Sequence, residues 1–179
     1  ILILDDKSTP FGIKLIERLK TNIKNIIAVE VGNQFSQKNA SCYTINVYNE
    51  QHVTLLFDKL FKDNIQLSHI LYLPSYDKVL PTIMDVNELI EGQKKTLTGL
   101  LFLVKAINSK KEKLFENKFI HLITVSSYAN FVLGQKELNY AKAVLPGWIK
   151  TIEQEFPYIK AYHVDLDNDS SLEKNVQCL

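Results

Sequence analysis

Ser127 and Tyr140 are the two residues of this sequence whose types and spacing match a pair that could reduce a carbonyl group. They stand thirteen residues apart, as in enzymes where a Tyr protonates the carbonyl oxygen and a Ser holds it. That chemistry also needs a Lys four residues after the Tyr, and Val144 stands there. Lys142 is only two residues on, about 200° around the predicted helix, so we do not expect it to substitute. We therefore interpret Ser127 and Tyr140 as vestigial rather than catalytic.

The turn after the first apolar run would have to hold any nucleotide cofactor, and it is degenerate. A dinucleotide-binding turn needs several glycines and a helix N-terminus aimed at the pyrophosphate. This chain offers Asp5, Asp6, Pro10 and Gly12, and only Gly12 stands at a plausible glycine position. A carboxylate at ~4 Å from a phosphate charge costs on the order of 4 kcal/mol at an effective dielectric of about 20. That cost is roughly a thousandfold in affinity, so we expect no bound cofactor in this chain.

Asp5 and Asp6 also admit a second interpretation, because an acidic pair after the first strand collects Mg²⁺ in phospho-receiver domains. Such a domain needs an Asp at the end of its third strand and a Lys at the end of its fifth. Here the third strand ends in residues 46–48 (NVY) and the fifth in Ser126 and Ser127. The acceptor is absent, so two solvated loop acids are the more probable interpretation and we expect no metal site.

Apolar runs alternate with helical patterns along the chain. Strands are predicted at residues 1–4, 26–31, 43–47, 69–73, 119–125 and 159–164, and helices at 11–20, 50–61, 84–108 and 140–155. Near-continuous apolar strands that alternate with helices indicate an α/β fold with a parallel sheet covered on both faces. We predict a Rossmann-like, doubly wound sheet with strand order 3-2-1-4-5-6. The segment from Asp165 onward is polar and is predicted to be loose.

Composition narrows the possible partners and the compartment. The chain has 179 residues, a net charge of +1 and 46% hydrophobic residues, which disfavours nucleic acid or a membrane as a partner. Cys42 and Cys178 fit no metal spacing and are expected to be free thiols in a cytoplasmic protein. The four histidines also lack partners at ligand spacing; they are His52, His69, His121 and His163.

The order of short motifs across residues 1–167 resembles the structural subdomain of a modular polyketide synthase ketoreductase. The clearest match is at residues 145–150 (LPGWIK), 155–157 (EFP) and 164–167 (VDLD). Four further stretches agree in order and spacing: 1–6 (ILILDD), 43–46 (YTIN), 55–60 (LLFDKL) and 69–73 (HILYL). The resemblance implies a truncated Rossmann-like subdomain at 1–167 and a polar tail or linker at 168–179, leading toward a catalytic subdomain.

This resemblance implies a non-catalytic scaffold that binds no cofactor and supports a partner half. That half holds NADPH and reduces a β-ketoacyl chain carried by an acyl carrier protein. The run from Tyr140 to Val144 echoes the family's catalytic Tyr-x-x-x-Asn but ends in Val, so no catalytic residue is carried over. Trp148 and residues 131–133 (FVL) are candidates for the docking surface. Two alternatives remain: a stand-alone pseudo-ketoreductase that braces a neighbouring synthase domain, and a divergent, active NADP-dependent short-chain reductase.

Overall fold

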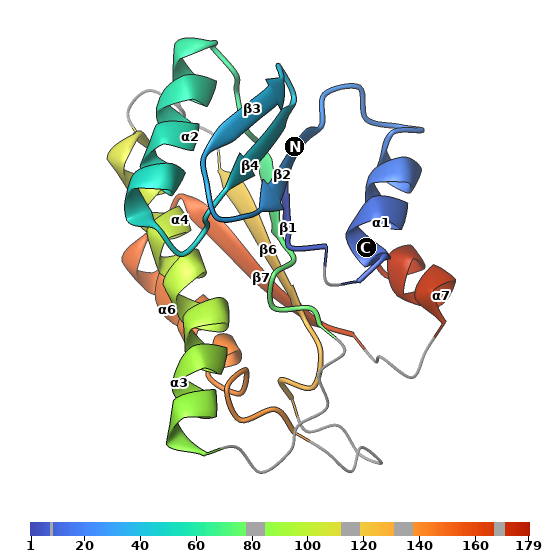
Figure 1. Cartoon of the computed structure of the whole chain (residues 1–179), viewed down its shortest axis with the longest axis vertical. Helices are drawn as coiled ribbons and strands as arrows, with labels where there is room; N and C mark the ends of the chain where they lie inside the picture. Colours follow the sequence, from blue (N-terminus) through green and yellow to red (C-terminus); the bar gives the residue numbers. More distant parts are fainter. Residues whose placement is uncertain (8, 78–84, 112–118, 131–137, 167–170) are drawn as a thin grey trace.

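The computed structural model describes residues 1–7, 9–77, 85–111, 119–130, 138–166 and 171–179. These residues form one seven-stranded sheet with the order β3-β4-β2-β1-β5-β6-β7 (Figure 1). The strands are β1 (Leu2–Asp5), β2 (Ile27–Val31), β3 (Ser36–Asn39), β4 (Cys42–Ile45), β5 (His69–Tyr72), β6 (Ile120–Ser126) and β7 (Ile159–Asp165). The helices are α1 (Phe11–Leu19), α2 (Glu50–Lys62), α3 (Val86–Gln93), α4 (Gly99–Ser109), α6 (Leu145–Glu155) and α7 (Leu172–Gln177), with a π-helical segment η1 (Lys94–Thr98).

The predicted doubly wound order is confirmed, since the six predicted strands lie side by side and in parallel. The sequence did not predict β3, which pairs antiparallel with β4 at the edge of the sheet. All four residues of β3 are exposed, so its sequence lacks the alternation of apolar and polar residues that predicts a strand. The whole connection from β2 to β4 is this short edge strand with its turns, where a doubly wound sheet commonly has a helix.

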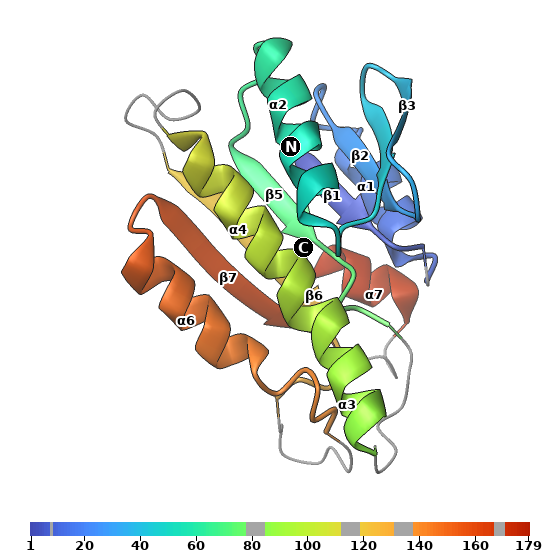
Figure 2. The ribbon, with the colours of Figure 1, turned by 60° about the vertical axis from the view of Figure 1, so that its left-hand side comes forward.

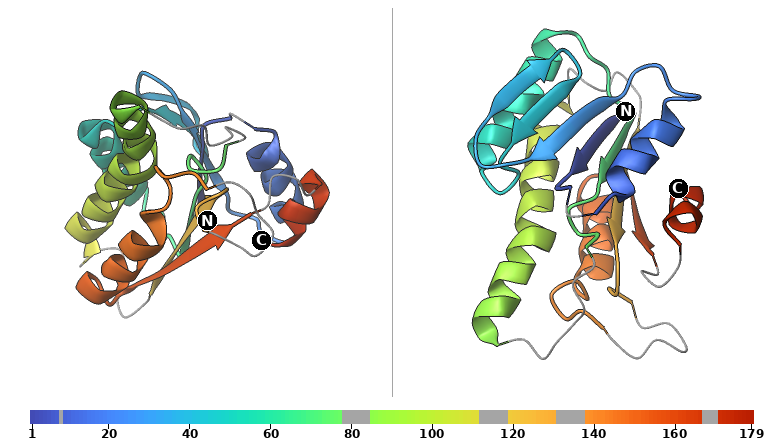
Figure 3. Two further views of the ribbon diagram at one scale, coloured as in Figure 1. Left: turned by 90° about the horizontal axis from the view of Figure 1, so that it is seen from below. Right: turned by 45° about the vertical axis from the view of Figure 1, so that its right-hand side comes forward.

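Helices cover both faces of the sheet (Figures 2 and 3). Helices α2, α4 and α6 lie on one face, and α1 and α7 lie on the other. Successive side chains of each strand point to opposite faces of the sheet and so pack against the two layers of helices in turn. In β1, Leu2 and Leu4 belong to the larger core beneath α2, α4 and α6, and Ile3 belongs to the smaller core beneath α1 and α7.

The predicted helix at 84–108 is interrupted by the π-turn η1, with α3 before it and α4 after it. The wider turn places the hydroxyl of Thr96 on the carbonyl oxygen of Ala141, at 3.1 Å. A Cβ on Gly92 would stand 2.7 Å from the Cβ of Ala141, so α3 lies against the segment at 139–144 with no space for a side chain. The first position of the prediction, residue 84, lies outside the described residues.

The predicted helix at 140–155 begins five residues late. Residues 140–144 form turns, and α6 starts at Leu145 with Pro146 in its first turn. Backbone N–H groups of Lys142 and Ala143 both bond to the carbonyl oxygen of Asn139, which closes the turn. This correction changes where the side chains of Tyr140 and Lys142 point.

The prediction of a loose segment after Asp165 is wrong for its last part. Residues 172–177 form α7, with Ser171 as its N-cap and with Asn175 and Val176 buried. The Asn175 amide donates to the hydroxyl of Tyr76 at 3.2 Å, and Lys14 of α1 pairs with Glu173. These contacts fasten the segment to α1, whereas its role as a linker stays a prediction.

Candidate functional site at the carboxyl edge of the sheet

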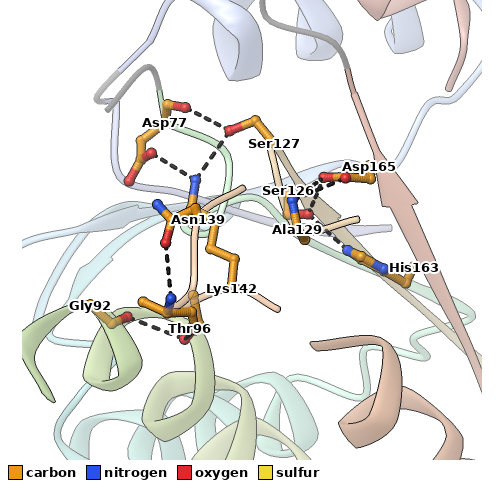
Figure 4. A network of polar contacts seen from close by, with 11 residues as sticks. Asp77, Gly92, Thr96, Ser126, Ser127, Ala129, Asn139, Lys142, His163 and Asp165 are labelled. Carbon is orange, nitrogen blue, oxygen red and sulfur yellow. Dashed lines mark hydrogen bonds and ion pairs between the residues drawn. The ribbon is translucent and has the colours of Figure 1, made fainter. Parts of the chain in front are cut away.

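The carboxyl ends of the parallel strands bring the chemically capable residues of the chain to one edge, as doubly wound sheets do. Asp5 ends β1, Asp77 follows β5, and Ser126 ends β6, with Ser127 immediately after it. Asp165 ends β7 and lies in register with Ser126. Figure 4 shows the polar network that joins the β5, β6 and β7 part of this edge.

Asp5 and Gly12, two members of the degenerate turn, are in direct contact. A Cβ built on Gly12 would stand 2.9 Å from Asp5 Oδ1 and closer still to Oδ2. The Asp5 carboxylate therefore fills the space over the first turn of α1, and Oδ1 accepts a hydrogen bond from the Lys7 backbone N–H at 3.2 Å. Pro10 occupies the N-cap position of α1 and is exposed.

The surroundings of this turn are acidic and partly buried. Burial raises the pKa of Asp5 to about 6, and the charges of Asp6 and Glu30 add to the shift. Asp6 also acts on two tyrosines nearby, Tyr48 and Tyr72. Burial first, and the charge of Asp6 second, raises the pKa of Tyr48 to about 12. Burial raises the pKa of Tyr72 strongly, with smaller contributions from Tyr48 and Asp6.

A second acid with a possible nucleotide role, Glu30 in β2, is already paired. Dinucleotide-binding proteins place a ribose-binding acid at a comparable distance beyond their turn. Here Glu30 Oε2 lies 2.6 Å from Lys7 Nζ and 2.9 Å from Lys38 Nζ. Hydrogen bonds from these two lysines lower the pKa of Glu30. Lys7, Glu30 and Lys38 border a pocket of about 200 Å³ beside α1. These three residues were not identified as a group from the sequence.

Ser127 is buried, and its hydroxyl both donates and accepts a hydrogen bond within this chain (Figure 4). It donates to the carbonyl oxygen of Asp77 at 2.7 Å and accepts from Lys142 Nζ at 3.1 Å. Lys142 Nζ also lies 2.7 Å from Asp77 Oδ1, and its side chain is 3% exposed. The expectation that Lys142 could not reach the site rested on a helix at 140–144. Because these residues form turns, Lys142 points inward.

Tyr140, the other member of the predicted pair, points elsewhere. Its side chain is 62% exposed, in the turn that precedes α6. In the part of the chain that the structure describes, no hydrogen bond joins Tyr140 to Ser127, whose partners are Lys142 and Asp77. The spacing of thirteen residues therefore does not bring the two hydroxyl groups together as a reductase would need.

Ser126, His163 and Asp165 form a second polar group at the same edge. Ser126 Oγ lies 2.8 Å from His163 Nε2 and donates to Asp165 Oδ1 at 2.7 Å. In a catalytic triad the acid orients the His, whereas here both groups bind the Ser hydroxyl, which is fully buried. Asp165 also accepts from the backbone N–H groups of Ala129 and Asn130, which fixes the loop after β6.

The histidines and cysteines, for which no metal site was predicted, do not gather at one place among the described residues. His69 and His121 stack at 4.7 Å between ring centroids on neighbouring strands, and both cysteines are free. Among the described residues, no three His, Cys, Asp or Glu side chains could together hold a metal ion. Within the same residues, no helix has both the length and the apolar composition needed to cross a membrane. The candidate docking residues at 131–133 lie outside the described part of the chain.

A family model described as beta-ketoacyl synthase-like, N-terminal, matches residues 1–179. The chain belongs to this beta-ketoacyl synthase-like N-terminal family. No protein with a curated description matches it in sequence. The predicted family resemblance is thus confirmed.

Two solved structures with ketoreductase domains share this family member's fold. One is a multidomain structure with adenylation, ketoreductase and pseudo-Asub domains from a keto acid-selecting NRPS module, with a TM-score of 0.80 and 24% identity; the match covers 95% of this chain and 13% of that one. The other is an N-terminal ketoreductase from the macrolactin assembly line, with a TM-score of 0.73 and 16% identity over 99% of this chain and 35% of that one. The aldohexose dehydrogenase of Thermoplasma acidophilum is also similar, with a TM-score of 0.68, 15% identity and coverage of 93% and 66%. The chain therefore has a reductase-like fold and spans only a small part of the first two structures.

Proposed function

We propose that this chain is the non-catalytic half of a ketoreductase and supports a separate catalytic half. The partner half would bind NADPH and reduce β-ketoacyl chains carried by an acyl carrier protein in a cytoplasmic synthase. The observation that carries the proposal is the Asp5 carboxylate over Gly12. It takes the space that a pyrophosphate would need at the start of α1 and adds negative charge there.

Two further contacts support the same proposal. Lys7 and Lys38 both pair with Glu30, the acid that would otherwise be free for a ribose. Lys142 and Asp77 engage the hydroxyl of Ser127, the group that would otherwise hold a substrate carbonyl. Glu30 and Ser127 are thus both used within the chain, and Tyr140 is exposed and points away from Ser127, so these residues do not fit NADPH.

The surface proposed for docking is the groove between α4 and α6. Leu97, Thr98, Leu101 and Trp148 line a pocket of about 180 Å³ there. Trp148 packs partly against the larger core, and its buried indole N–H has no hydrogen-bond partner among the described residues. Leu101 beside it is 37% exposed. An apolar groove is the kind of surface that fits a second domain, and we assign this one to the catalytic half.

The test is reconstitution with the catalytic ketoreductase half of the same synthase. NADPH-dependent reduction of a β-ketoacyl substrate is measured for the catalytic half alone and with this chain added. A complex of the two, with activity that depends on this chain because a packed neighbour holds the loops of the catalytic half, would support the proposal. The absence of a complex at micromolar concentrations would overturn it.

A further inference from the structure

Lys142 is among the least exposed charged residues in the described part of the chain, and its ammonium group bonds to side chains on two other segments. Its ammonium group bonds to Asp77 Oδ1, after β5, and to Ser127 Oγ, after β6. A buried ion pair of this kind needs good geometry to offset the loss of hydration. The pair therefore ties the turn before α6 to two strand ends that are far away in sequence.

Tyr128, the residue after Ser127, has a strained backbone. Its φ of 60° lies in the left-handed region, which a bulky side chain rarely adopts, and the residue is 7% exposed. Such a conformation persists only where neighbouring contacts enforce it. The structure shows those contacts on both sides of the residue. Asn139 N–H donates to the carbonyl oxygen of Tyr128 at 2.8 Å, and Ala129 N–H donates to Asp165.

The turn that carries Lys142 is the one that holds Tyr128. Asn139 and Lys142 belong to the same turn, because Lys142 N–H donates to the carbonyl oxygen of Asn139 at 2.9 Å. The Asn139 side chain accepts from the backbone N–H of Ala141 at 3.1 Å. Thr96 of η1 donates to the carbonyl oxygen of Ala141 from the other side. The turn thus lies between the π-turn and the strained loop, with the Lys142 ammonium group at its inner end (Figure 4).

We propose that Lys142 is the positioning residue that holds the loop at 127–130 in its strained conformation and keeps the hydroxyl of Ser127 engaged. Lys142 orders this loop as a bound ligand orders a binding loop. This edge of the sheet is therefore ordered by a residue of the same chain. The inference does not depend on the proposed scaffold function, since it concerns the conformation of this chain alone.

The test is amide hydrogen exchange on the 179-residue chain and its variants. Lys142→Met removes the ammonium group and keeps the length of the side chain. The loop amides of Ala129, Asn130 and Asn139 are followed, with Leu73, which bonds to Leu4 across the sheet, as the core amide. In Lys142→Met we expect the loop amides to exchange at least about tenfold faster relative to Leu73 than in the wild type. The control is Lys150→Met on the exposed surface of α6, which should leave this ratio unchanged.

A second variant separates the positioning of the loop from the stability of the whole chain. It also provides the test if Lys142→Met does not fold. Asp77→Asn combined with Lys142→Met removes both charges of the pair, so the denaturation midpoint should return toward that of the wild type. If Lys142 positions the loop, its amides still exchange fast in the double variant while Leu73 recovers. Loop amides that recover together with Leu73, or that never change in Lys142→Met, would overturn the proposal.

Discussion

The carboxylate of Asp5 rests against the α-carbon of Gly12. The space beside Gly12 that a side chain would occupy is filled by both oxygens of Asp5, one of them 2.9 Å from an ideal Cβ position. Gly12 lies in the first turn of α1, where a dinucleotide-binding protein would admit the phosphates. A side chain at position 12 would therefore overlap an acid of the same chain, and this contact yields the first prediction.

Gly12→Ala should destabilise the protein by about 1–3 kcal/mol, because the added methyl group overlaps the Asp5 carboxylate in a packed region. Urea denaturation at neutral pH measures the change. Gly147→Ala is the matched control, since Gly147 also lies in the first turns of a helix but the added methyl meets no described atom within 4 Å outside its own stretch of helix. That variant should gain up to about 1 kcal/mol from helix propensity. Equal effects at the two sites would contradict the account of Asp5.

Asp5→Ala should relieve the cost of Gly12→Ala. With the carboxylate gone, the methyl group has room, so the two changes together should be less destabilising than their sum by at least about 0.5–1 kcal/mol. A double-mutant cycle by urea denaturation gives this coupling energy. Simple additivity of the two changes would show that Asp5 does not fill the space over Gly12 in solution.

Asp5→Asn should stabilise the protein at pH 7.5 and not at pH 4. Burial raises the Asp5 pKa from 3.8 to about 6, so the folded state binds a proton more readily than the unfolded state. Wild-type stability should therefore rise as the pH falls from above 6 toward 3.8, by at most about 3 kcal/mol. Asn keeps the oxygen that accepts from Lys7 and lacks this pH dependence.

Other groups titrate in the same range, so the comparison of the two proteins isolates Asp5. Burial lowers the pKa of His163, which makes both proteins lose stability as the pH falls through the unfolded value of 6.5. The difference in the free energy of unfolding between Asp5→Asn and wild type should shrink steadily from pH 7.5 to pH 4. A difference that is constant with pH would refute the raised pKa.

Ser127→Ala and Tyr140→Phe should affect stability very differently. Ser127→Ala removes the donor to the carbonyl oxygen of Asp77 and one acceptor for Lys142, at a cost of about 1–3 kcal/mol. Tyr140→Phe removes an exposed hydroxyl and should change stability by less than about 0.5 kcal/mol. Thermal denaturation compares the two. A large effect of Tyr140→Phe would mean that this hydroxyl has a partner in solution.

Leu101→Glu should weaken the complex with the catalytic half at least about tenfold and leave the fold intact, because it puts a charge into the groove between α4 and α6. Leu55→Glu is the matched control. Leu55 is a leucine on α2, outside the groove, and is somewhat more exposed than Leu101. Affinities are measured by calorimetry with the purified catalytic half. Equal losses in the two variants, or none in Leu101→Glu, would move the docking surface elsewhere.

The sequence predicted the parts of the fold that rest on periodic burial. The six parallel strands followed from apolar runs such as β6, and the degenerate turn was predicted between Asp5, which ends β1, and Gly12 in the first turn of α1. Strand β3 could not be predicted, because its residues are polar and only pairing with β4 fixes them. Helix α7 is short, and its stability comes from tertiary contacts such as Asn175 with Tyr76.

The candidate site was predicted less well, because its geometry depends on one turn. Tyr140, Ala141 and Ala143 are compatible with a helix, but tertiary hydrogen bonds to Lys142 and to the carbonyl oxygen of Ala141 hold the segment as a turn. Local propensity is overridden in such cases. The inward direction of Lys142 followed from that turn alone, so no spacing rule could have identified its bond to Ser127.

The most direct test of the central claim is a calorimetric titration of NADPH into the 179-residue chain at pH 7.5. Because Asp5 fills the space over Gly12 and lysines pair with Glu30, we predict no binding tighter than about 1 mM, which is about 4 kcal/mol. A dissociation constant below about 100 μM would contradict the account and favour an active reductase.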